Sequence, residues 1–271
     1  MKTKKILIFL TLGTLFACQQ NEPQETTNES LKLFVTVEND ELGALTRSLG
    51  MNYSLGKNAF SAGEVLSVAA ANEDFLPYTI GKDNYLWNNM KTTNQNVELA
   101  AHYPAVDNRQ LREERILEGG AEYLFGTTEV AQGSSNAALR MKRMTVPVVL
   151  LSENGEPYNG NAKVTLHLQN EGVQNLRTGL IQAAPNALKE EIEINKFSDG
   201  PITNLIPQRL VKGQRIGTVA YGGIEKNIFV DQNISLSSGN MLSIRLSEYT
   251  NDIIIDGSIP LRNEPIRRRN R

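Results

Sequence analysis

Short runs in which apolar and polar residues alternate cover most of the chain. The run at 31–37 reads Leu-Lys-Leu-Phe-Val-Thr-Val, and turn-forming Asn, Gly, Asp and Ser separate it from later runs of the same kind. An apolar period of two residues is typical of half-buried strands, and no long segment shows the helical period of 3.6. The run at 162–169 predicts one inward face: Ala162, Val164, Leu166 and Leu168. The pattern therefore predicts an all-β fold.

A break of small polar residues at 132–136 divides the predicted strands into two groups. Before the break we expect strands at 31–37, 65–71, 85–87, 97–102 and 121–125. After it we expect strands at 139–151, 162–169, 191–194, 216–221, 227–230, 241–246 and 253–259. Because a hairpin seldom straddles two domains, 139–151 and 162–169 are assigned together, with Pro147 marking an edge or a bulge. The expected domains are 31–137 and 138–271, and 172–188 is left open as a short helix or a loop.

The first 17 residues have the features of a secretory signal. Three lysines are followed by an apolar run at 6–16, which is too short to span a bilayer as a mature helix. The run ends in Leu-Phe-Ala-Cys, the pattern of a lipoprotein cleavage site, and this predicts that Cys18 is lipidated. Two or more acyl chains on this single cysteine of the chain would give a stable membrane anchor. Residues 18–30 are rich in Gln, Asn, Glu and Thr and are predicted to be a flexible tether.

The residues that chemistry would need are scarce. The chain has 28 basic and 30 acidic residues, and this near balance does not favour a nucleic-acid partner. His102 and His167 are far apart without metal-ligand spacing, so we expect structural or surface roles for both. No nucleophile motif or phosphate-binding glycine loop is present. The sequence predicts no enzyme, no metal site and no cofactor.

Several segments together resemble the fimbrillin-like family of surface and pilus proteins. In the first half, 60–68 is similar to the family's phenylalanine, Gly-Asp and apolar strand, with Glu64 at the acidic position. The segments 84–87 and 99–104 are similar to its tyrosine-tryptophan strand and its Ala-Tyr-Tyr-Pro segment, with His102 as a departure. Further similar segments follow in the expected order at 123–126, 139–146, 205–208 and 236–240. The likeness spans most of the mature chain.

This resemblance implies two tandem transthyretin-like β-sandwiches, carried to the outer membrane as a surface-exposed, lipid-anchored protein. In polymerising members of the family, an Arg-specific protease removes the N-terminal strand, and the groove then accepts a strand from a neighbouring subunit. The bond Arg47–Ser48 is the candidate cut, with an ordinary surface arginine as the alternative. The apolar residues of the candidate removed strand are Leu31, Leu33, Phe34, Val35 and Val37.

A candidate donor strand lies near the C-terminal end of the sequence. Its apolar residues are Ile253, Ile254, Ile255 and Ile259, and the alternative is an ordinary last strand of the second sandwich. The implied partners are other fimbrial subunits, identical or different, bound by strand exchange, a host protein or glycan, and the outer membrane through the lipid.

Two interpretations of the function stay open at this point. The first is a fimbrial component, which covers a shaft subunit, a tip adhesin and an unprocessed anchor. The second is a monomeric outer-membrane lipoprotein that binds glycan or a host protein through exposed aromatic residues. The candidates for such a platform are Tyr53, Tyr78, Tyr85 and Trp87, although Trp87 lies in an alternating run and is better placed in the core. A hydrolase would need a site that we do not find.

Overall fold

The structure is a computed structural model that describes residues 30–38, 56–86, 96–106, 113–131, 133–158, 160–184, 189–194, 203–255 and 259–260. Every helix or strand element in these ranges is a β-strand, which confirms the all-β prediction. No helix within these ranges is long and apolar enough to cross a membrane.

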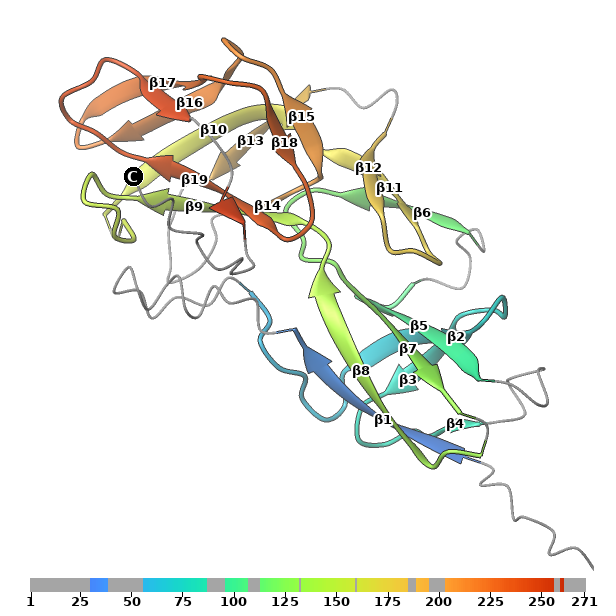
Figure 1. Cartoon of the computed structure of the whole chain (residues 1–271). Coiled ribbons are helices and arrows are strands. Elements are labelled where there is room, and N and C mark those ends of the chain that lie inside the picture. Colours follow the sequence, from blue (N-terminus) through green and yellow to red (C-terminus); the bar gives the residue numbers. More distant parts are fainter. Residues whose placement is uncertain are drawn as a thin grey trace, which may run out of the picture.

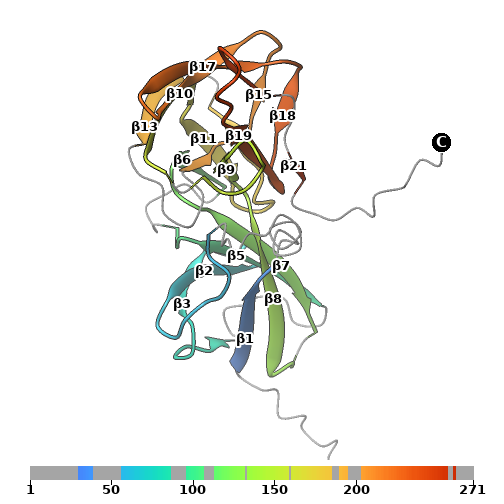
Figure 2. The ribbon, with the colours of Figure 1, turned by 90° about the vertical axis from the view of Figure 1, so that its left-hand side faces the viewer.

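The first sheet contains seven strands in the order β3–β2–β5–β7–β8–β1–β4. It forms the lower half of the molecule in Figures 1 and 2. All seven strands contribute side chains to one hydrophobic core, in which Leu66, Leu99 and Leu139 are fully buried. The strands are β1 (Ser30–Val37), β2 (Val65–Ala70), β3 (Leu76–Thr79), β4 (Tyr85–Leu86), β5 (Val97–Tyr103), β7 (Leu124–Val130) and β8 (Asn136–Arg143).

Two further sheets and a strand pair enclose a second core in the upper half (Figure 1). The five-stranded sheet has the order β13–β10–β16–β17–β20, the four-stranded sheet has the order β14–β9–β19–β21, and β15 pairs with β18. The predicted inward residues of β10 are all buried in this core. The strands are β9 (Val146–Leu151), β10 (Ala162–Gln169), β13 (Lys189–Ile194), β14 (Thr203–Leu205), β15 (Gln208–Leu210), β16 (Arg215–Tyr221), β17 (Ile224–Val230), β18 (Ile234–Leu236), β19 (Asn240–Arg245), β20 (Ile253–Ile255) and β21 (Ile259–Pro260).

The predicted strand at 139–151 is wrong, because the chain crosses from the first sheet to the second within it. β8 pairs with β1 and β7, whereas β9 pairs with β14 and β19. β8 alternates between exposed and buried residues, but all six residues of β9 are buried, so the period changes between the two strands. The predicted limit after residue 137 therefore cuts through β8, which belongs with the first sheet.

Pro147, expected at an edge or a bulge, lies in β9, which is an internal strand of its sheet and not an edge. It faces Asn204 of β14, and the parallel pairing of β9 with β19 begins only at the next residue, Val148. A proline is tolerated here because the strand has not yet gained its second neighbour.

A third sheet joins the two halves, with the order β12–β11–β6. β6 (Glu114–Glu118) comes from the first half of the sequence, while β11 (Glu171–Asn175) and β12 (Ile181–Ala183) come from the second. The open question at 172–188 is thus answered up to residue 184 by a strand hairpin. A small apolar cluster fills the junction and consists of Ala100, Leu117, Phe125, Met144, Ile181 and Ile206.

Gly179 in the β11–β12 turn lies close against the apolar cluster at this junction. Its φ is +70°, and a Cβ atom there would lie 2.2 Å from the ring of Phe125. We expect Gly179→Ala to lower the free energy of unfolding by about 2 kcal/mol, from backbone strain together with displacement of the ring. Urea titration can measure this loss.

Gly213 provides the matched control for that substitution. Its φ is +78°, but a Cβ atom there would meet nothing within 4 Å. Gly213→Ala should therefore cost only the backbone strain, about 1 kcal/mol. Equal losses for the two variants would show that Phe125 does not restrict the turn.

Candidate functional site

The first strand lies in a groove between β8 and β4. β1 runs parallel to β8 in a register from Lys32 opposite Asn136 to Val37 opposite Met141. Two further hydrogen bonds extend this ladder, from Lys32 N to Ser135 O (2.9 Å) and from Glu38 N to Met141 O (2.7 Å). On its other side β1 pairs with β4 through two residues only. Nearly the whole backbone of β1 is thus bound to β8.

The side chains of β1 alternate between the groove and the solvent, as its sequence predicts. Leu31, Leu33 and Val37 are buried in the first core, and Val35 is half-buried. Phe34 points outward and is 52% exposed. Burial of a leucine or valine side chain contributes about 1.5–3 kcal/mol, so the buried residues bind the strand firmly.

Tyr78 of β3 lies at the floor of this groove. Its hydroxyl oxygen accepts a hydrogen bond from the backbone N of Leu33 (3.1 Å), and burial raises the pKa of the phenol above its usual value of 10. Tyr78 and Tyr85 are both buried in the first core, so these two candidates do not belong to an exposed aromatic platform. A tyrosine on a short alternating strand packs its ring inward and needs only one polar partner there. Tyr53 and Trp87, the other two candidates, lie outside the described residues.

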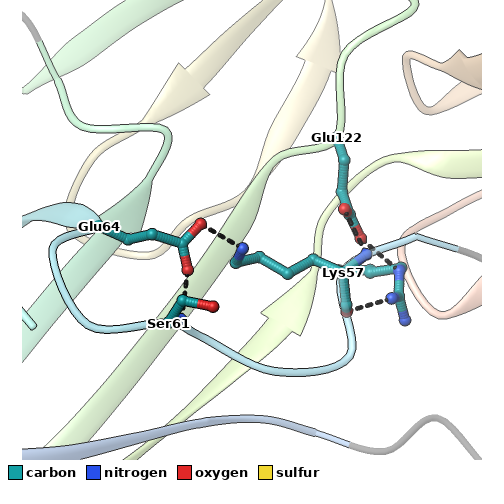
Figure 3. A network of polar contacts seen from close by, with 5 residues as sticks. Lys57, Ser61, Glu64 and Glu122 are labelled. Carbon is teal, nitrogen blue, oxygen red and sulfur yellow. Dashed lines mark hydrogen bonds and ion pairs between the residues drawn. The ribbon is translucent and has the colours of Figure 1, made fainter.

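A polar network holds the loop at 56–64, which leads into β2. Lys57 Nζ lies 2.5 Å from Glu64 Oε1, and Glu64 Oε2 accepts a hydrogen bond from Ser61 N (2.6 Å; Figure 3). The backbone N of Lys57 donates to Glu122 Oε2 (2.8 Å), and Arg143 forms an ion pair with Glu122 Oε1 (2.6 Å). The hydrogen bond from Lys57, followed by that from Ser61 N, holds the pKa of Glu64 below its usual value of 4.5. These loop residues have no apolar period, so no pattern in the sequence indicates the network.

The candidate donor residues lie in sheets of the second half. Ile253 and Ile255 are buried, Ile254 is 55% exposed, and β20 pairs in parallel with β17 at the edge of the five-stranded sheet. Ile259 belongs to β21, which pairs with β19. Whether these strands act as donors stays a prediction.

Three other predicted site residues, Cys18, Arg47 and Ser48, lie outside the described residues. Among the residues that are described, no three His, Cys, Asp or Glu side chains gather into a possible metal site.

Solved structures of other proteins share this arrangement. No protein-family model matches the sequence, and a comparison with curated proteins finds no match. A solved structure described as a "putative cell adhesion protein" from Bacteroides thetaiotaomicron VPI-5482 is 39% identical, with a TM-score of 0.70. The match covers 86% of this chain and 100% of that chain. The chain belongs to the fimbrillin-like family.

Two more solved structures with the same description share the fold of this fimbrillin-like chain. One comes from Bacteroides ovatus ATCC 8483, with 15% identity and a TM-score of 0.54, covering 85% of this chain and 96% of that one. The other comes from Bacteroides uniformis ATCC 8492, with 13% identity and a TM-score of 0.51, covering 86% and 100%. At these identities the likeness concerns the fold alone.

Proposed function

We propose that this protein is a structural or adhesive component of a bacterial surface fimbrium and that it assembles by exchange of β1. The observation that carries the proposal is the position of β1. It fills the groove between β8 and the short edge strand β4, yet it runs parallel to β8 and precedes every other described strand. Parallel neighbours need a long connection, so the chain that follows β1 is its one covalent link to the described strands, and hydrogen bonds and buried side chains hold it in the sheet. One cut between residues 38 and 56 would break the covalent link between β1 and the rest of the chain. The groove would then remain when β1 departs.

The vacated groove would take a strand from another subunit. Such a strand would form the main-chain hydrogen bonds that β1 makes with β8, and its alternate side chains would replace Leu31, Leu33 and Val37. β20 has three register pairs with β17, and β21 has two with β19, compared with six between β1 and β8. These short edge strands need only a few broken hydrogen bonds to leave their sheets, which supports Ile253, Ile254, Ile255 and Ile259 as donor residues.

The proposed location follows from the N-terminal segment. Lipidation of Cys18 would anchor the chain in the outer membrane, and the tether at 18–30 would leave the strands free at the cell surface. This role requires no catalytic step and no cofactor. A shaft subunit would lose β1, whereas an anchor would keep both its lipid and its first strand. The division into two transthyretin-like sandwiches remains part of this proposal.

Digestion of the mature chain from residue 19 with an Arg-specific protease tests the assembly step. We expect selective cutting at Arg47, detected by mass spectrometry, followed by filaments in electron micrographs. Arg47→Lys keeps the positive charge but removes the cleavage site, so this variant should stay uncut and monomeric.

Two outcomes would contradict a shaft subunit. The chain could resist cutting at Arg47, or it could be cut there and remain monomeric. Either result would leave an anchor, a tip adhesin or a monomeric lipoprotein that binds glycan or a host protein. Binding to such ligands by the uncut chain would then support the last of these.

A further inference from the structure

β8 depends on β1 for most of its pairing. It has six register pairs with β1, but only two with β7, where Arg143 faces Leu124 and Lys142 faces Phe125. Both of these pairs lie at the C-terminal end of β8. When β1 leaves, the remainder of the strand loses its ladder on that side. If the groove is to accept a new strand, contacts other than those with β1 must keep β8 in position.

The contacts of Arg143 meet this need. Its side chain is buried, its Nε lies 2.6 Å from Glu122 Oε1, and its Nη2 donates a hydrogen bond to Lys57 O (2.6 Å). Glu122 in turn accepts a hydrogen bond from Lys57 N. The two side chains thus hold both main-chain polar groups of Lys57, and three distant segments meet at the end of β8. Charge-assisted contacts of this kind are stronger in a partly buried site than in water.

The side chain of Lys57 links these contacts to β2 and β5. Its Nζ contacts Glu64, which immediately precedes β2 (Figure 3), and lies 5.0 and 4.9 Å from the ring centroids of Phe60 and Tyr103. Gly56 fits beside Glu122, because a Cβ atom there would lie 2.6 Å from the carboxylate. None of these residues belongs to β1. All follow Arg47 in the sequence, so a cut at that bond would leave every contact in place.

We propose that Lys57, Glu64, Glu122 and Arg143, here called the Lys57 clamp, hold the end of β8 in position while β1 is exchanged. The clamp keeps the groove ready for an incoming strand. This inference rests on the proposed function, because it names the residues that preserve the acceptor groove.

The test compares Glu122→Gln and Arg143→Gln with Arg140→Gln. Arg140 lies on the same strand as Arg143 but is exposed, so it controls for the loss of one positive charge from β8. Each full mature chain is cut with the Arg-specific protease and mixed with a labelled peptide of residues 30–38. Anisotropy then follows peptide uptake. We expect at least tenfold weaker uptake by both clamp variants and uptake by Arg140→Gln within twofold of the unsubstituted chain.

Amide hydrogen exchange of the uncut chains tests the clamp independently of whether β1 can be replaced by another strand. The amides of residues 139–143 should exchange at least tenfold faster in the clamp variants than in Arg140→Gln. If the unsubstituted chain takes up no peptide but these amides differ as expected, the proposed function fails and the clamp stands. If the amide rates are equal, or if both clamp variants take up the peptide normally, the clamp is overturned.

Lys57→Met provides a milder test in case Glu122→Gln or Arg143→Gln fails to fold. It removes the cation that lies against the rings of Phe60 and Tyr103 but leaves the main-chain contacts with Glu122 and Arg143. We expect an intermediate loss of peptide uptake, about threefold, with a circular dichroism spectrum like that of the unsubstituted chain. Normal uptake by this variant would remove the side chain of Lys57 and its partner Glu64 from the clamp.

Discussion

Leu31→Ala is expected to lower the free energy of unfolding by about 2–5 kcal/mol. Leu31 is fully buried in the first core, and the smaller side chain would leave a cavity between β1 and the rest of the sheet. Urea titration followed by circular dichroism measures the loss. Because β1 is held by side chains as well as by its ladder, the same variant should release the strand more readily after a cut at Arg47.

Phe34→Ala is the control on the same strand. Phe34 is 52% exposed, and the nearest contact described for its ring is Lys32 Nζ, 5.5 Å from the centroid. Its loss should cost less than about 1 kcal/mol, although it removes more atoms than Leu31→Ala does. If the two variants were equally destabilised, the outward face of β1 would contribute as much as the groove, and the assignment of inward residues would be wrong.

Strands buried on one face can be predicted from the sequence. β1 and β10 alternate because one side of each meets a core, and the apolar period alone is enough to identify their inward residues. The segment 139–151 is different, because every residue of β9 is buried and a continuous apolar run hides the point at which one strand ends. Pairing with β1 on one side and with β19 on the other shows where the break lies.

The contacts that shape the candidate site could not be predicted, because they join residues far apart in the chain. Lys57 is separated by 65 residues from Glu122 and by 86 from Arg143. Charged residues in loops usually lie in solvent, so their type gives no indication of a buried partner. The burial of Tyr78 could not be predicted for a related reason, since the partner of its hydroxyl, the backbone N of Leu33, lies 45 residues away in the chain. The groove that holds β1 thus depends on residues that the local apolar pattern does not identify.

His102 shows how the same limit applies at the junction. Its expected structural role is correct, but no sequence pattern indicates its partners. The imidazole packs between Phe75 and Phe125, with centroid distances of 5.1 and 4.9 Å, and its Nε2 lies 2.7 Å from Leu176 O. Arg177, the residue after Leu176, donates hydrogen bonds to the backbone oxygens of Ala71 and Glu73. These contacts join β5 and the loop after β2 to the turn between β11 and β12.

Acid is expected to destabilise the protein through this histidine. Burial lowers the pKa of His102 from 6.5 to about 3; the carbonyl of Leu176 opposes the shift, and the charges of Arg115 and Arg177 add to it. Above pH 6.5 the imidazole is neutral in both states, and its contribution to stability is complete. As the pH falls below 6.5, the unfolded chain binds a proton that the native protein excludes until about pH 3. The loss is about 1.4 kcal/mol per pH unit, on the order of 5 kcal/mol in all.

Urea titrations of the protein and of His102→Gln, from about pH 7 to about pH 4, measure this loss. Glutamine keeps a donor for Leu176 O but does not titrate, so the variant should be less stable near neutral pH and should lose less stability in acid. The carboxylates titrate in both proteins and cancel in the difference. His167→Gln, on the half-exposed face of β10, controls for removal of a histidine elsewhere. If the free energies of unfolding of the protein and of His102→Gln fell in parallel with pH, protonation of His102 would not contribute to the loss of stability. Converging curves would show that protonation of His102 contributes to the loss of stability in acid.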